Sequence, residues 1–193
     1  LPSGAGVSSS SALVCGLIKG LSILNEIKLT NSQIIDLSRT IEHKYIGVKG
    51  GVMDQFTILN AKKNMAILLN CSNLNVKYIN LKLEDYKILL LNTNVKHNLA
   101  NSDYNQRVKE CKSAIKIIEK KCDHKFSNLS DIKFEDLEIS KSHLSNKQYR
   151  RVSYVLKENQ RTIESAKLIK SHKLQEFGRL MYKSHDGLKN DYE

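Results

Sequence analysis

The strongest constraint on the fold is the stretch LPSGAGVSSSSALV at residues 1–14, where two glycines and four serines lead directly into an apolar segment. Glycines let a backbone approach a bound anion closely, and successive N–H groups can point into one concavity. A helix that starts there adds unpaired N–H groups and the positive end of its dipole. No Lys-Ser or Lys-Thr pair follows the glycines, so this is not a Walker loop. The stretch predicts a phosphate-binding loop, with a flexible linker as the alternative.

A second glycine-rich stretch, EHKYIGVKGGVMDQF, covers residues 42–56. It places Asp54 beside two glycines, and Glu42 lies twelve positions earlier, near the expected end of a helix. Near a polyphosphate, one carboxylate could hold Mg²⁺ while the other accepts the proton of an attacking hydroxyl. Spacing alone leaves open that Asp54 is a turn residue and Glu42 a surface residue.

A third segment, NTNVKHNLANSDYNQRVKEC at residues 92–111, indicates a strand end, a polar loop and a helix that starts at Ser102. Tyr104 and Arg107 are three positions apart and would share a helical face. The Tyr104 ring could close one side of a sugar pocket while its hydroxyl forms one hydrogen bond. Packing at a domain boundary is the alternative for Tyr104, and Arg107 is expected to be structural.

Hydrophobic periodicity indicates an α+β class. Leucines at Leu13, Leu17, Leu21 and Leu24 predict one stripe of a first helix, and Asn31 is the expected N-cap of a second. Short aliphatic runs at 65–71, 76–83 and 86–94 predict strands, the first two as a hairpin. Helical periodicity then returns, interrupted by a mixed polar segment at 126–147 that should hold only short structure. The predicted helices on either side of this segment are expected to turn the following residues inward: Val108, Cys111, Ile115, Ile118, Val152, Val155, Leu156, Ile163, Ala166, Leu174, Phe177, Leu180 and Met181.

The formal net charge of +11 raises the question of nucleic-acid binding. The lysines are spread along the chain, aromatics are few and tryptophan is absent, so no base-stacking platform is apparent and no nucleic-acid partner is expected. No apolar run approaches the ~20 residues of a membrane span, and no signal peptide is recognisable. The four cysteines lack metal-site spacing and are expected to be free buried thiols. These features predict a cytoplasmic protein without a membrane partner.

The first stretch is similar to the second motif of the GHMP kinases, a Pro-x-Gly-x-Gly-Leu-x-Ser-Ser loop that wraps the ATP phosphates. The resemblance implies ATP and Mg²⁺, with Ser10 supplying a hydroxyl to the metal. It also implies that six residues line the phosphates: Gly4, Ala5, Gly6, Ser8, Ser9 and Ser10.

Within this superfamily, the stretch at 42–56 resembles the galactokinase segment that carries the catalytic aspartate in Met-Asp-Gln. The resemblance implies that Asp54 is the base for the anomeric hydroxyl, that Glu42 ligates Mg²⁺ and that the Gly51 backbone contacts galactose. Many galactokinases have Cys-Gly where this chain has Gly50-Gly51. The third segment is also similar to galactokinases, in which the tyrosine at the position of Tyr104 contacts galactose.

The resemblance implies the two-domain GHMP kinase fold, with a ribosomal S5 domain 2-like part at 1–82 and a ferredoxin-like part at 83–193. It is weak between about 123 and 145. Neither the family's early sugar-binding motif nor its late glycine-rich motif is recognisable here. The expectation is therefore a monomeric galactokinase incomplete at both ends, of which this piece alone is inactive and poorly soluble.

Three alternatives remain open. One is an N-acetylgalactosamine kinase or another GHMP small-molecule kinase, since SSSSALVC has some of the former's character. Another is a non-catalytic galactose and ATP sensor, which the Ser11-Ala12 pair disfavours. The third is a basic nucleic-acid module, which does not account for GGVMDQF.

Overall fold

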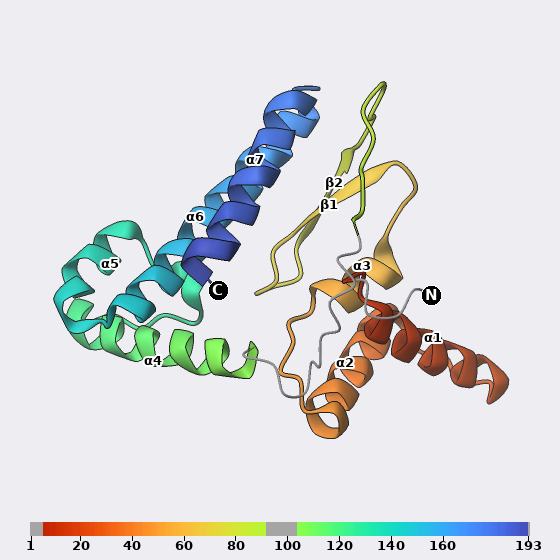
Figure 1. Ribbon diagram of the computed structural model, residues 1–193. Helices are drawn as coiled ribbons and strands as arrows, with labels where there is room; N and C mark the ends of the chain where they lie inside the picture. The colour runs from red at the N-terminus through yellow and green to blue at the C-terminus, as the bar shows by residue number, and fades with distance from the viewer. Residues whose placement is uncertain (1–5, 92–103, 193) are drawn as a thin grey trace. The chain divides into compact units, whose positions relative to one another are not determined.

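The computed structural model describes residues 6–91 and 104–192, including the backbone but not the side chain of Tyr104. Its contacts divide the chain into two units (Figure 1). Unit 1 comprises Leu1–Tyr78 and Glu84–Tyr104, and unit 2 comprises Ile79–Leu83 and Asn105–Glu193. The described architecture is mostly helical with a two-stranded sheet. The domain boundary after residue 82 and the S5-like and ferredoxin-like assignments stay predictions.

Unit 1 begins with three helices that contact one another pairwise. They are α1 (Ser9–Leu24), α2 (Asn31–Ile41) and α3 (Met53–Asn60), with a π-helical turn η1 (Glu42–Ile46) directly after α2. The N-cap of α2 is Thr30 rather than the expected Asn31, since the Thr30 hydroxyl accepts from the Gln33 N–H and the Gln33 side chain accepts from the Thr30 N–H. The Thr-x-x-Gln capping box was the signal for this start.

The leucine stripe of α1 lies in solvent, since Leu13, Leu17, Leu21 and Leu24 are all more than half exposed. The buried positions of α1 are Ser11, Cys15 and Ser22. Small side chains on that face let α1 pack closely against α2 and α3. The apolar period identified the helix but not the face that it buries.

The sheet consists of β1 (Met65–Leu69) and β2 (Val76–Asn80), which confirms the hairpin. The strand expected at 86–94 is wrong for its described part, because residues 86–91 are irregular and their apolar side chains are exposed. A strand needs a hydrogen-bonding neighbour, and no described segment pairs with this one. A small apolar core of Ile35, Val52 and Phe56 packs against the partly buried side chains of Leu59, Ile67, Leu69 and Val76.

In unit 2, the described residues from Asn105 onward form helices joined by short connections. Its elements are α4 (Tyr104–Cys122, of which Tyr104 itself falls in unit 1), η2 (Leu129–Asp131), α5 (Phe134–Ser140), η3 (Lys141–His143), α6 (Asn146–Lys170), α7 (Leu174–Gly187) and η4 (Leu188–Tyr192). Helices α6 and α7 pack along each other (Figure 1).

The core of unit 2 contains Ala114, Ile118, Phe126, Ile132, Leu137, Leu144, Val152 and Leu156. Residues 126–147 hold short helices as expected, but they contribute four of these core side chains. Two positions expected inside, Ile163 and Met181, are about half exposed.

All four cysteines are free, but Cys71 is exposed and Cys122 only half-buried, which corrects the expectation of buried thiols. Within the described residues, no helix has both the length and the apolar content needed to cross a bilayer.

Candidate functional site

Two residues just before α1 have left-handed backbone conformations. Gly6 (φ 69°) and Ser8 (φ 58°) both occupy the left-handed region, so the chain turns sharply before the helix. Ser8 is the N-cap, but its hydroxyl makes no capping hydrogen bond, and the first turn carries no acidic residue. The helix start is therefore not neutralised by a side chain of its own first turn. Of the other predicted phosphate residues, Ser9 is half-buried and Ser10 is exposed, and Gly4 and Ala5 lie outside the described residues.

Glu42 lies at the junction of α2 and the π-helical turn. Gly47 ends this turn with φ 81°, a conformation that favours glycine. Its N–H and that of Val48 both donate to the Glu42 carbonyl oxygen, the latter at 3.1 Å. The His43 ring lies 3.0 Å from the Gly50 carbonyl oxygen. These bonds fold the glycine-rich loop back onto the helix end that carries Glu42.

The Glu42 side chain is buried in a polar cluster drawn from three helices, which we name the Ser11–Glu42–Gln55 cluster. Ser11 Oγ donates to Glu42 Oε1 at 2.6 Å, and Gln55 Nε2 donates to Glu42 Oε2 at 2.7 Å. Gln55 Nε2 also lies 3.3 Å from Ser11 Oγ. The three residues are 3%, 7% and 1% exposed, respectively. The cluster thus joins the phosphate-loop helix, the Glu42 turn and α3 at one point.

The nearby thiol of Cys15 is not a reactive group. Burial raises the pKa of Cys15, the Ser38 hydroxyl lowers it in part, and the negative charge of Glu42 raises it further. A thiol with a raised pKa stays protonated near neutral pH and is a poor nucleophile. Cys15 therefore serves packing, which agrees with its place on the small-residue face of α1.

Asp54 is the second residue of α3, in its first turn, rather than a residue of the preceding loop. Its side chain is half-buried and makes no hydrogen bond or ion pair with any described residue. The start of a helix favours a negative charge, which suits an ionised carboxylate there. Because Asp54 directly precedes Gln55, the hydrogen bonds of Gln55 hold this turn of α3 beside the first turn of α1.

The remaining predicted sugar contacts are placed only in part. Gly51 is exposed, and no described atom lies within 4 Å of where a Cβ would be. Tyr104 begins α4, but its side chain lies outside the described residues, as does most of the preceding segment. Arg107 lies over the Tyr192 ring at 5.9 Å, within a cluster of the second unit.

The described residues include no group of three or more His, Cys, Asp or Glu side chains that could form a metal cage. This is compatible with Mg²⁺, which proteins bind through one or two carboxylates together with water and substrate phosphates. Glu42 fits that role, since Ser11 donates to one of its oxygens and Gln55 to the other, while a carboxylate has about four acceptor positions.

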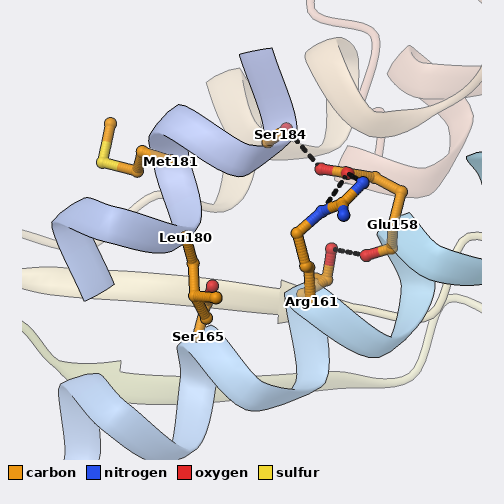
Figure 2. A pocket seen from close by; sticks show the side chains of 7 residues that line it. Glu158, Arg161, Ser165, Leu180, Met181 and Ser184 are labelled. Atoms are coloured by element: carbon orange, nitrogen blue, oxygen red, sulfur yellow. Dashed lines mark hydrogen bonds and ion pairs between the residues drawn. The ribbon is translucent and has the colours of Figure 1, made fainter. Parts of the chain in front are cut away.

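Unit 2 contains a cavity of about 280 Å³ between α6 and α7 (Figure 2). Glu158 and Arg161 on α6 form an ion pair at 2.7 Å, and Ser184 on α7 donates to Glu158. Met181 points away from this group in Figure 2. Because these polar groups satisfy one another, the cavity is a weaker candidate than the site in unit 1.

Sequence reasoning identified Glu42 and Asp54 but gave Ser11 and Gln55 no part in holding Glu42. Ser11 is 31 positions from Glu42 and 44 from Gln55, so no local spacing reports their contact. In the sequence, Gln55 stood out only as the residue that follows Asp54.

The chain resembles known proteins in both sequence and structure. Residues 1–62 match the GHMP kinases N terminal domain. The matched part contains α1, α2, η1 and α3, so this part of the chain is similar to the GHMP kinases.

The chain is also similar over its full length to galactokinases. It is 37% identical to the galactokinase of Thermotoga maritima over 193 residues, which is 52% of that protein. It is 38% identical to the galactokinase of Clostridium acetobutylicum over 197 residues, which is 49% of that protein. A crystal structure of Lactococcus lactis galactokinase complexed with galactose superposes with a TM-score of 0.92 at 30% identity, covering all of this chain and 50% of the other. The chain therefore spans about half the length of these relatives.

Proposed function

We propose that the intact protein is a galactokinase that transfers the γ-phosphate of MgATP to the C1 hydroxyl of α-D-galactose, in the cytoplasm and as a monomer. The similarity to galactokinases over the full chain supports this assignment. One structural observation supports it most directly: the Ser11–Glu42–Gln55 cluster holds the start of α1 beside the turn that carries Asp54. A phosphate loop and a free carboxylate then belong to one site.

The backbone from Gly4 to Gly6 and the hydroxyls of Ser8 and Ser9 would bind the ATP phosphates at the start of α1. Ser10 and Glu42 would hold Mg²⁺, which when bound neutralises charge that develops on the phosphate oxygens. The Gly51 backbone and Tyr104 would hold galactose. Phosphoryl transfer depends mainly on such positioning and charge stabilisation.

Asp54 would accept the proton of the attacking hydroxyl. Its half-buried carboxylate has no described partner to displace, which suits a general base. A general base contributes ~10²–10⁴-fold to a rate. We therefore expect Asp54→Asn in the intact protein to lower galactose-dependent ADP release at least ~100-fold.

The matched control is Asp36→Asn, which removes an exposed carboxylate of α2 and should leave turnover unchanged. Near-normal turnover of Asp54→Asn would remove Asp54 from the role of base. If wild-type protein released ADP faster with N-acetylgalactosamine than with galactose, the substrate assignment would be wrong. Binding of both ATP and galactose without any turnover would instead indicate a sensor.

A further inference from the structure

Gln55 is one of the most deeply buried polar side chains described, yet its amide is only half satisfied. Nε2 donates to Glu42 Oε2 at 2.7 Å, whereas Oε1 is buried and has no hydrogen-bond partner among the described residues. The partner of the amide fixes its orientation, because a carboxylate oxygen can accept a hydrogen bond only from the amide N–H groups. The amide thus places its donor on Glu42 and leaves its own acceptor without a donor.

An apolar side chain of similar size would fill the same volume without an unsatisfied oxygen. Buried polar atoms without partners are uncommon in folded proteins and call for a specific reason. Here the reason is the hydrogen bond that Gln55 donates to Glu42 Oε2. Packing alone does not account for a glutamine at this position.

We propose that Gln55 is a positioning residue that fixes the Glu42 carboxylate toward a divalent cation, with Ser11 as its secondary partner. This inference rests on the proposed function, in which Glu42 ligates the cation of MgATP. With Ser11 on Oε1 and Gln55 on Oε2, both carboxylate oxygens are held, so the plane of the group cannot rotate freely. The lone pairs that remain point in fixed directions, as in other sites whose ligating carboxylates are themselves hydrogen-bonded.

Direct measurement of cation affinity tests this assignment without relying on turnover. Mn²⁺ replaces Mg²⁺ as a paramagnetic probe, and the intact protein is titrated in the presence of a non-hydrolysable ATP analogue while free Mn²⁺ is followed by electron paramagnetic resonance. Loss of a group that hydrogen-bonds a metal ligand typically weakens metal binding ~10–100-fold. We expect Gln55→Met to raise the Kd for Mn²⁺ at least ~10-fold, and Ser11→Ala to raise it by a smaller factor.

Ser22→Ala is the matched control. Ser22 is buried on the same helix as Ser11, but its hydroxyl donates to the Lys19 carbonyl oxygen at 2.8 Å and not to the cluster. This variant should leave the Kd for Mn²⁺ unchanged. If Ser22→Ala and Ser11→Ala raised the Kd for Mn²⁺ equally, any loosening of α1 would weaken cation binding. That result would overturn the positioning role.

Glu42→Gln separates failure of this inference from failure of the proposed site. If Glu42→Gln weakens Mn²⁺ binding while Gln55→Met and Ser11→Ala do not, the positioning role is wrong and the cation role of Glu42 stands. If Glu42→Gln has no effect, both roles are wrong, whereas galactose-dependent ADP release still tests the activity separately. Circular dichroism establishes whether Gln55→Met folds; if it does not, Ser11→Ala decides, and an unchanged Kd in that variant overturns the proposal.

Discussion

Unit 2 has an apolar interior, whereas the most enclosed side chains of unit 1 include a hydrogen-bonded polar cluster. In unit 2, side chains such as Ile118, Leu137 and Val152 are fully buried against one another. In unit 1, the compact apolar core consists of Ile35, Val52 and Phe56, and the Ser11–Glu42–Gln55 cluster is buried among the helices beside it. Apolar burial stabilises without directional demands, while a buried polar cluster stabilises only when its members are paired. The two clusters therefore differ in what holds them together: directional hydrogen bonds in the polar cluster of unit 1, and apolar contacts in the core cluster of unit 2.

The largest expected effect on stability comes from breaking the apolar interior of unit 2. Leu137 is fully buried in the short helix α5, and Leu137→Ala removes its contacts and leaves a cavity. We expect a loss of about 2–5 kcal/mol in the free energy of unfolding, measured by chemical denaturation. Ile139→Ala, two residues along the same helix but 63% exposed, should change it by less than about 0.5 kcal/mol. Equal losses in the two variants would contradict the assigned core.

Breaking the polar cluster of unit 1 should have a smaller effect. Gln55→Met removes the hydrogen bond that Gln55 donates to Glu42 Oε2, which costs about 1–3 kcal/mol in the free energy of unfolding. The double variant Glu42→Met/Gln55→Met removes both members of the pair and should recover part of that loss. If the double variant lost more free energy of unfolding than the two single variants lose together, this site would behave like the apolar core of unit 2.

A further and smaller effect concerns acid stability in unit 2. Burial alone would raise the pKa of Glu110, but hydrogen bonds from Arg151 and Gln106 and the charge of Lys147 outweigh it and hold that pKa below its ordinary value. Ionised Glu110 therefore stabilises the fold above its unfolded-state pKa, and this contribution is lost as the pH falls through the lower folded-state value. Denaturation curves recorded at decreasing pH should show a shallower loss of stability for Glu110→Gln than for the wild type. Identical pH dependence would mean that this carboxylate does not contribute.

The smallest effect is expected on the outer face of α1. Leu17 is 56% exposed in the leucine stripe, so Leu17→Gln in the 193-residue chain should change the free energy of unfolding by less than about 0.5 kcal/mol. Ile34→Ala, at a fully buried position of the neighbouring helix, provides the contrast with an expected loss of about 2–5 kcal/mol. A large loss at Leu17 would show that the stripe is covered.

Local patterns in the sequence located most elements because they depend on residues close together in the chain. The hairpin and the long helices were predicted correctly as elements, whereas the phosphate-binding role of the glycine-serine stretch stays a prediction. Glu42 and Asp54 were identified from short motifs, although their roles stay predictions. The strand expected at 86–91 failed because a strand depends on a neighbour that no local pattern specifies.

What the sequence determined by itself was therefore the longer helices, the hairpin and the residue types available for phosphate and proton chemistry, but not α3, which was expected to be loop where it carries Asp54. Only the tertiary structure decided which faces are buried. The four leucines that form one stripe of α1 are exposed, while Ser11 and Cys15 are enclosed. It also brought Ser11, Glu42 and Gln55 into one cluster from positions up to 44 residues apart. Periodicity reports that a helix has two different faces, but which face is covered depends on what the rest of the chain packs against it.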